Sequence, residues 1–226
     1  MNCLWCDQEM IIEMNWTNMM NLPKPKPLCD LCESKLNLLK GEQCERCSRM
    51  TSEKICSDCN WWLNQTNSDP LVFNYSVYKY NEQMQAMIAK WKYRGDFILA
   101  QAFKQPFIQS FHRKFSDLKE DMIVIPIPLS DERLYERGFN QAKILATFLP
   151  IEQRELITRI HSEKQSKMSR SERIATKNPF KIEGKINKSV ILVDDIYTTG
   201  STIRHAASLL KKQGCPKVYA YTLIRG

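Results

Sequence analysis

Two adjacent carboxylates followed by a run of hydroxyl residues form the segment of this chain best suited to chemistry. Asp194 and Asp195 are followed, two residues later, by Thr198, Thr199, Gly200, Ser201 and Thr202. Ionised carboxylates only accept hydrogen bonds, so two of them suit a neutral diol, which donates two. The hydroxyl and backbone N–H groups that follow suit an anion. A diol beside a phosphate is the pattern of ribose 5-phosphate.

The flanking sequence predicts a strand before this segment and a helix after it. Residues 190–193 are four consecutive aliphatic residues, which indicates a short buried strand of a parallel sheet. Ile203, Ala206, Ala207 and Leu210 have helical spacing, and Gly214 is expected just beyond the helix. Gly200 would let the backbone approach a ligand closely. The alternative is a helix-capping loop with two solvated acids.

Strand and helix patterns alternate along the rest of the chain, which is typical of an α/β fold with a parallel sheet. Asn81 is expected to cap a helix whose core-facing stripe ends at Trp91, and Pro106 to interrupt a later helix. Residues 152–188 read as a basic loop that either is solvated or covers the phosphate site. The other predicted elements are strands at 71–80, 122–126 and 217–224 and helices at 131–136 and 139–149.

Eight of the nine cysteines fall into four C-x-x-C pairs between residues 3 and 59. Four such pairs in a short stretch are typical of zinc binding, with two pairs supplying the four thiolates of each ion. Four thiolates leave no position for water, so both zinc ions would be structural. Sequential pairing of neighbouring C-x-x-C pairs is favoured, and the spacing also permits an interleaved pairing. Sequential pairing gives the ligand sets Cys3, Cys6, Cys29, Cys32 and Cys44, Cys47, Cys56, Cys59.

Composition divides the chain into a predicted zinc ribbon domain, residues 1–62, and a second domain, residues 71–226. Residues 1–62 carry 7 Lys/Arg and 9 Asp/Glu, which leaves 26 and 16 of the chain's 33 and 25 for the remainder. A basic second part favours phosphorylated ligands or nucleic acid, or is simply a basic surface. Trp61 and Trp62 are expected to pack against this second domain.

The chain is expected to be cytoplasmic. It has no apolar run of about 18 residues that predicts a transmembrane helix, and its first ten residues lack a signal-peptide pattern. Cysteines spaced for metal rather than for disulfides fit a reducing compartment.

Three features together resemble the ComF family of late-competence proteins. They are the four C-x-x-C pairs, Pro126-Ile127-Pro128 with Arg-Gly-Phe-Asn-Gln-Ala at residues 137–142, and the 194–202 segment. The last is similar to the loop of type I phosphoribosyltransferases that binds phosphoribosyl pyrophosphate (PRPP). The resemblance covers nearly the whole chain. It implies a type I phosphoribosyltransferase-like parallel sheet flanked by helices, preceded by a cysteine-rich double zinc ribbon.

The resemblance also implies roles for residues. Asp194 and Asp195 would hold the ribose hydroxyls of PRPP, residues 198–202 its 5-phosphate, and Mg²⁺ would accompany the pyrophosphate. Further contacts to phosphate or DNA are expected from Arg137, Arg170 and Arg173, because a guanidinium can bind phosphate bidentately. Thr198 stands where the 6-oxopurine enzymes carry an acid, so no residue is assigned to a nucleobase.

The function implied is that of a late-competence protein of natural transformation. It would handle incoming single-stranded DNA in the cytoplasm, reaching the inner face of the membrane through a helicase-like ATPase partner. One alternative is an active phosphoribosyltransferase that moves ribose 5-phosphate to or from a nitrogenous base. Another is a structural adaptor whose loop is vestigial.

Overall fold

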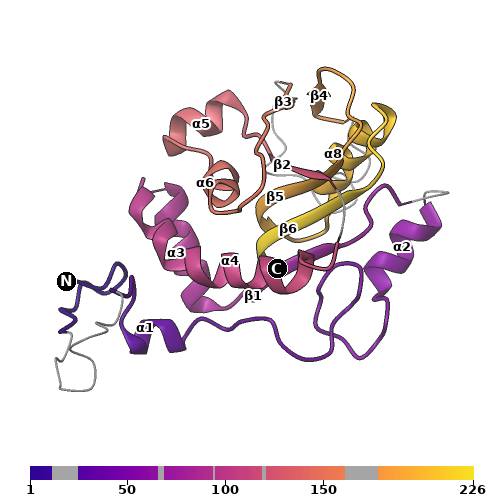
Figure 1. The fold of residues 1–226 in the computed structure, drawn as a ribbon. Helices are drawn as coiled ribbons and strands as arrows, with labels where there is room; N and C mark the ends of the chain where they lie inside the picture. The colour runs from indigo at the N-terminus through magenta and orange to yellow at the C-terminus, as the bar shows by residue number, and fades with distance from the viewer. Residues whose placement is uncertain (12–24, 66–68, 94, 119–120, 161–177) are drawn as a thin grey trace.

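A four-stranded parallel sheet with strand order β1-β6-β5-β2 forms the centre of the protein (Figure 1). The structure, a computed structural model, describes residues 1–11, 25–65, 69–93, 95–118, 121–160 and 178–226. A short antiparallel pair, β3 with β4, stands apart from the sheet. The strands are β1 (Asn74–Lys79), β2 (Met122–Pro126), β3 (Ile157–Arg159), β4 (Phe180–Ile182), β5 (Ser189–Tyr197) and β6 (Val218–Arg225).

Helices cover both faces of the sheet, so its central strands are buried on both sides. Buried residues of α3, α4 and α6 pack on the face that carries Ile191 and Val193. Those of α8 pack on the opposite face, with Val190 and Leu192. The helices are α1 (Asp30–Ser34), α2 (Ser57–Gln65), α3 (Glu82–Tyr93), the 3₁₀ helix η1 (Phe97–Ala100), α4 (Gln101–Phe115), α5 (Asp131–Arg137), α6 (Gln141–Thr147) and α8 (Ser201–Lys212). None of the described helices is long and apolar enough to cross a membrane.

Strand β5 is longer than the sequence predicts. It continues four residues past Val193, because β6 pairs with it as far as Tyr197 opposite Arg225. Asp194 and Asp195 are therefore residues of the strand and not the first residues of a loop. Successive side chains of a strand point to opposite faces of its sheet, so the two carboxylates leave the strand in different directions.

The prediction that Pro106 interrupts a helix is wrong. Helix α4 runs through it from Gln101 to Phe115. A proline inside a helix costs roughly 3 kcal/mol, whereas burial of each large apolar side chain contributes about 1.5–3 kcal/mol. Four buried phenylalanines on α4 outweigh the proline, namely Phe103, Phe107, Phe111 and Phe115. Residues 152–188 also differ from the predicted loop, because they contain β3 and β4.

The cysteine-rich segment lies along the open edge of the sheet beside β1 (Figure 1). The amide of Leu39 donates to Val77 O at 2.8 Å and that of Asn74 to Arg46 O at 2.8 Å. Covering an edge strand in this way prevents it from pairing with other chains. The predicted division at residues 62 and 71 stays a prediction, and the two parts share buried contacts across it.

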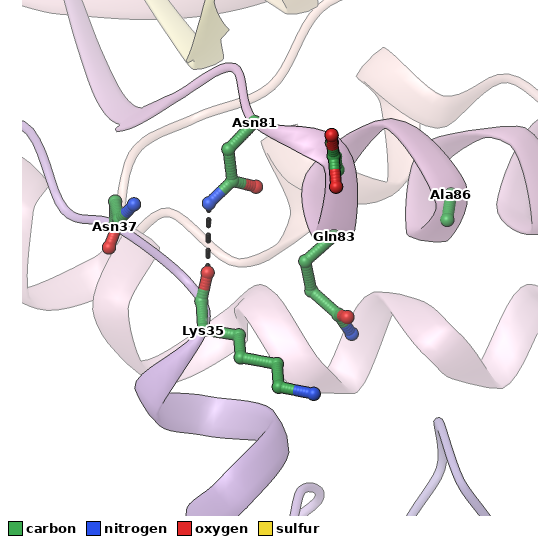
Figure 2. A pocket seen from close by; sticks show the side chains of 6 residues that line it. Lys35, Asn37, Asn81, Gln83 and Ala86 are labelled. Carbon is green, nitrogen blue, oxygen red and sulfur yellow. Dashed lines mark hydrogen bonds between the residues drawn. The ribbon is translucent and has the colours of Figure 1, made fainter.

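Asn81 connects the first helices of the two parts. Its Oδ1 accepts from the amide of Met84 at 2.8 Å, which confirms it as the cap of α3. Its Nδ2 donates to Lys35 O at 2.8 Å, across a polar recess that Gln83 also lines (Figure 2). One side chain thus binds the carbonyl at the end of α1 and caps the start of α3.

Candidate ligand site and cysteine centres

A small pocket lies where the carboxyl ends of β2 and β5 meet the loops that follow them. Its volume is about 110 Å³, and its walls include Asp194, Asp195, Thr202 and Arg137. The carboxyl end of a parallel sheet is the usual place for a ligand in such folds. Four residues selected from the sequence are therefore brought together. Asn140 and Gln141 of the 137–142 segment also line it, together with polar residues that the sequence did not single out, namely Lys92, Arg133 and Arg159. Arg170 and Arg173 lie outside the described residues.

Asp195 is paired with a lysine from a distant helix. Its Oδ2 lies 2.5 Å from Lys92 Nζ of α3, and both side chains are 12% exposed. A buried ion pair of this kind is stabilising only while both charges are present. Any neutral hydroxyl that binds Asp195 must share the carboxylate with this lysine or displace it.

Asp194 is protonated more readily than an ordinary carboxyl. Burial, followed by the charge of Asp195, raises its pKa from 3.8 to about 7. The amide of Asp195 donates to Asp194 Oδ1 at 2.9 Å and works against this shift. Near neutral pH Asp194 can thus accept or release a proton, or accept a hydrogen bond.

Several cations converge on the pocket. Burial and the neighbouring charge of Arg133 lower the pKa of Arg159. Arg137 donates to Gln141 Oε1 at 3.1 Å. Arg137 Nε and Gln141 Nε2 are buried donors without a hydrogen-bond partner among the described residues. Buried donors normally have partners, so these two indicate room for an acceptor such as a phosphate oxygen.

The Arg-Gly-Phe-Asn-Gln segment builds this corner of the pocket. Gly138 ends α5 in the left-handed conformation with φ +76°. Asn140 begins α6 by accepting from the amide of Ala142 at 2.9 Å, and its Nδ2 donates to Ile127 O at 3.0 Å. The segment therefore turns the chain sharply, which leaves Arg137 and Gln141 beside the carboxylates.

The loop after β5 enters α8 through Gly200, which has φ +78°. A Cβ at this position would lie 2.1 Å from Tyr197 Oη and 2.3 Å from Arg204 Nη1, so only glycine fits. The amide of Ser201 is 3.4 Å from Thr199 Oγ1. The amides of Thr199, Gly200 and Thr202 donate to no acceptor in the part of the chain that the structure describes. These donors lie at the N-terminus of α8, where the sequence predicts an anion site.

A buried arginine, Arg204, packs against this loop. Arg204 is 3% exposed, binds Asp69 through Nη2 at 2.9 Å and donates to Tyr197 Oη at 2.6 Å. Its guanidinium lies 4.7 Å from the centre of the Trp62 ring. Trp62 Nε1 in turn donates to Thr199 O at 3.1 Å. Trp62 thus packs on the second part of the chain, as predicted, and holds the loop directly.

Replacing Trp62 by phenylalanine should weaken phosphate binding without loss of zinc. The ring contact with Arg204 is kept, but the hydrogen bond to Thr199 O is lost. One hydrogen bond contributes about 0.5–1.5 kcal/mol, so we expect a two- to tenfold weaker affinity for inorganic phosphate or PRPP. Calorimetry together with zinc analysis measures both quantities. Trp61→Phe is the matched control, because Trp61 is 38% exposed.

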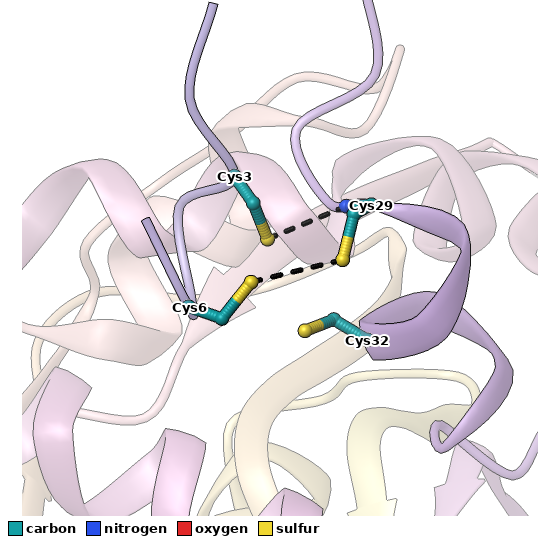
Figure 3. A group of neighbouring side chains, drawn as sticks. All are labelled: Cys3, Cys6, Cys29 and Cys32. Atoms are coloured by element: carbon teal, nitrogen blue, oxygen red, sulfur yellow. Dashed lines mark hydrogen bonds between the residues drawn. The ribbon is translucent and has the colours of Figure 1, made fainter. Parts of the chain in front are cut away.

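The eight paired cysteines form two separate groups of four, in the sequential order. The first contains Cys3, Cys6, Cys29 and Cys32 (Figure 3), and the second Cys44, Cys47, Cys56 and Cys59. Within each group the sulfur atoms lie within 4.8 Å of one another. The interleaved pairing is therefore not adopted.

Both groups have dimensions that suit zinc. Cys6 Sγ and Cys29 Sγ are 3.7 Å apart, and Cys47 Sγ and Cys56 Sγ are 3.6 Å apart. A tetrahedron with Zn–S bonds of about 2.3 Å has sulfur atoms about 3.8 Å apart. An amide also donates to one sulfur of each group, from Cys29 to Cys3 and from Cys56 to Cys44, at 3.3 Å. The two groups each offer four thiolates to a structural zinc ion.

The second group touches the end of β5. A hydrogen bond from Cys59, aided by the charge of Arg225, lowers the pKa of Cys47 to about 4. Arg225 Nη2 lies 3.8 Å from Cys47 Sγ, and its Nη1 donates to Tyr197 O at 3.1 Å. A zinc ion with four thiolates would carry a net negative charge, which this buried arginine would offset. The second cysteine group and the loop after Tyr197 are thereby linked through Arg225.

Comparison with known proteins identifies the family. The family model "Phosphoribosyl transferase domain" matches residues 134–226. Competence protein ComFC of Bacillus subtilis (strain 168) is 37% identical over 228 residues, which covers 99% of this chain and 94% of the relative. The chain belongs to the ComF family.

Other relatives of this ComF-family protein carry similar names. Competence protein ComFC of Streptococcus pneumoniae (strain ATCC BAA-255 / R6) is 32% identical and covers 100% of both chains. DNA utilization protein YhgH of Escherichia coli O157:H7 is 28% identical, covering 88% of this chain and 96% of the relative. A solved hypoxanthine phosphoribosyltransferase from Staphylococcus aureus matches with a TM-score of 0.34 and 16% identity, over 56% of this chain and 64% of that one. That TM-score is too low to support any conclusion about this chain.

The ComF-family protein thus has a phosphoribosyltransferase domain with a parallel sheet and flanking helices, and its N-terminal cysteines form two groups suited to zinc ribbons. The prediction of family and fold class is confirmed. The roles of the individual residues toward PRPP and metal stay predictions.

Proposed function

We propose that this protein handles incoming single-stranded DNA during natural transformation and that its phosphoribosyltransferase domain binds PRPP with Mg²⁺. The names of the relatives, competence protein and DNA utilization protein, support the role in competence. The observation that carries PRPP binding is the meeting of two carboxylates, Thr202 and several cations in one pocket, beside loop amides that have no acceptor among the described residues.

Each part of PRPP has a counterpart in the pocket or in the loop beside it. Asp194 and Asp195 accept hydrogen bonds from the ribose hydroxyls, and the amides of residues 199–202 donate to the 5-phosphate. Arg133 and Arg137 supply positive charge for the pyrophosphate. Mg²⁺ prefers phosphate and carboxylate oxygens, and both aspartates offer the latter. The metal would neutralise the pyrophosphate and favour its departure.

The pocket must open to admit PRPP. Its volume of about 110 Å³ is below the roughly 300–1,000 Å³ of ordinary ligand pockets. Opening the ion pair between Lys92 and Asp195 frees the carboxylate for the ribose and the lysine for a phosphate. Binding of the ligand thus replaces one buried charge contact by two.

Calorimetry with PRPP and Mg²⁺ tests the binding site. We expect one PRPP per chain, with heat that depends on Mg²⁺. Ribose 5-phosphate should bind more weakly, because it lacks the pyrophosphate. A chain that gives no heat with PRPP under these conditions is the structural adaptor, and the proposed site is then wrong.

Single-stranded DNA binding is proposed from the basic character of residues 63–226 and from the relatives' names. Affinity for an oligonucleotide should fall steeply with salt, since phosphate contacts release counterions. Fluorescence anisotropy at low and at physiological salt measures this. A helicase-like ATPase of the competence system remains the proposed protein partner, and co-purification with the tagged chain tests it.

A second candidate function is catalysis of phosphoribosyl transfer. The observation that favours it is Asp194, whose pKa of about 7 suits a group that exchanges a proton near neutral pH. Labelled PRPP incubated with a panel of nitrogenous bases would reveal a ribosylated product. Absence of turnover across the panel, with PRPP still bound, restricts the domain to ligand binding.

The same carboxyl should make stability depend on pH. Because its folded pKa is raised, its stabilising contribution is complete below pH 3.8 and is lost as pH rises through about 7. The loss is at most roughly 4 kcal/mol, at 1.36 kcal/mol per pKa unit. Denaturant unfolding from pH 5 to pH 8 should show the wild type losing stability relative to Asp194→Asn, which cannot ionise. Parallel pH curves for the two proteins would contradict the assigned environment of Asp194.

A further inference from the structure

An apolar groove of about 550 Å³ lies beside the carboxylate pocket and shares Pro128, Leu129 and Asn140 with it. Its walls come from η1, α5 and α6 and from the turn between the last two. The residues that give it its character are Phe97, Leu134, Phe139, Ile144 and Phe148. Its volume is in the range of ordinary ligand pockets.

Large exposed apolar side chains line one groove here, and such clustering often marks an interaction site. Phe97 is 55% exposed and Leu134 is 43% exposed. The rings of Phe97 and Phe139 meet edge to face with centroids 5.5 Å apart, so they form a fixed aromatic wall. An exposed aromatic wall beside a ligand site indicates a second ligand with flat apolar surfaces.

Cations lie in the groove, beside another of its rings and on its side toward the carboxylate pocket. Lys143 lines the groove with half of its side chain exposed, although it also pairs with Glu155 at 2.6 Å. Lys104 Nζ lies 5.6 Å from the centre of the Phe148 ring. On the side toward the pocket, Arg137 lies 5.8 Å from the ring of Tyr93, which is 70% exposed. Aromatic rings interleaved with cations are the usual surface for single-stranded nucleic acid.

We propose that this groove binds the bases of single-stranded DNA, while Lys104 and Lys143 contact its phosphates. The inference rests on the proposed DNA-handling function and names its surface. Duplex DNA does not fit the same chemistry, because its bases are already stacked and paired and cannot present their faces to Phe97 and Phe139. A strand in this groove has one nucleotide next to the carboxylate pocket.

Anisotropy titrations with a fluorescent oligothymidylate test the groove. Phe97→Ala should weaken binding about tenfold, since stacking of a base on an aromatic ring contributes about that factor or more. Ile98→Ala is the matched control, because Ile98 is 60% exposed on the same turn but does not line the groove. The control should bind like the wild type.

An oligonucleotide of abasic sugars separates stacking from charge. Phe97→Ala should leave the affinity for this polyanion unchanged. Lys143→Glu should weaken the binding of both oligonucleotides and make their affinities less dependent on salt. Lys54→Glu, in the cysteine-rich segment, is the control for net charge, since the Lys54 side chain is 77% exposed.

The outcomes distinguish this inference from the function on which it rests. Wild-type protein that binds no oligonucleotide at low salt overturns both. Wild-type binding that Phe97→Ala and Lys143→Glu leave unchanged overturns the groove alone, and the proposed DNA-handling function survives. Equal losses from Phe97→Ala on the base-containing and abasic ligands also overturn the groove, because the effect is then not stacking.

Discussion

Replacing Asp194 and Asp195 together by asparagine should weaken PRPP binding by at least about 100-fold. Each carboxylate is expected to accept a hydrogen bond from the ribose, and hydrogen bonds to a charged group contribute about 1.5–3 kcal/mol each. Two of them therefore account for at least a factor of about 100. Calorimetry with PRPP and Mg²⁺ measures the loss. Asp121→Asn, at the residue that precedes β2, is the control, since the Asp121 side chain is 73% exposed.

The double substitution also removes the partner of Lys92, whose side chain is only 12% exposed. Breaking a buried pair at one side costs about 3–5 kcal/mol, so the variant should also melt at a lower temperature. A third substitution, Lys92→Gln, should restore part of the stability but not the affinity. Recovery of PRPP binding in that triple variant would show that the carboxylates do not contact the ribose.

The second large effect concerns the two cysteine groups, which should differ in what they stabilise. Cys59 is 1% exposed and lies in the core shared with β5 and α8, whereas Cys6 is exposed. Structural zinc contributes roughly 10–16 kcal/mol in small zinc-binding peptides, which is as large as the whole stability of a domain, about 5–15 kcal/mol. Cys59→Ser should therefore unfold the sheet domain or abolish its PRPP binding. Cys6→Ser should lose one zinc ion but keep the folded sheet domain and its PRPP binding.

Zinc analysis, thermal unfolding and PRPP calorimetry on both variants check this expectation. The wild type should contain two zinc ions per chain, and chelation should remove the ion at the first group earlier, because Cys6 of that group is exposed whereas all four cysteines of the second group are buried. If Cys59→Ser holds one zinc ion fewer but binds PRPP with wild-type affinity, the contacts of Arg225 and Trp62 have no role in forming the loop between β5 and α8.

The elements that depend on local pattern could be predicted from the sequence. The apolar stripe of α3, its Asn81 cap and the Gly214 residue beyond α8 depend on residues within a few positions of one another. The C-x-x-C pairs are also local, since each pair is one turn of chain. The order of acids, hydroxyl residues and glycine then indicated what the end of β5 would bind.

Contacts between distant residues could not be predicted in this way. Lys92 and Asp195 lie on different elements, and only packing of α3 against the sheet brings them together. The length of β5 depends on β6, because a strand continues as long as its neighbour supplies hydrogen bonds. Pro106 remains helical because phenylalanines on either side of it are buried in the core.

The sequence by itself thus determined the chemical character of the site, because that character depends on residue types and their spacing. It favoured the sequential grouping of the cysteines without excluding the interleaved one, and it left open which cation meets Asp195. Only the tertiary structure decided both, because loop closure and the packing of helices on the sheet select one set of neighbours from many of similar spacing. Trp62 and Arg204 support the loop between β5 and α8, and this support also depends on the tertiary structure, since the two residues are distant in the sequence.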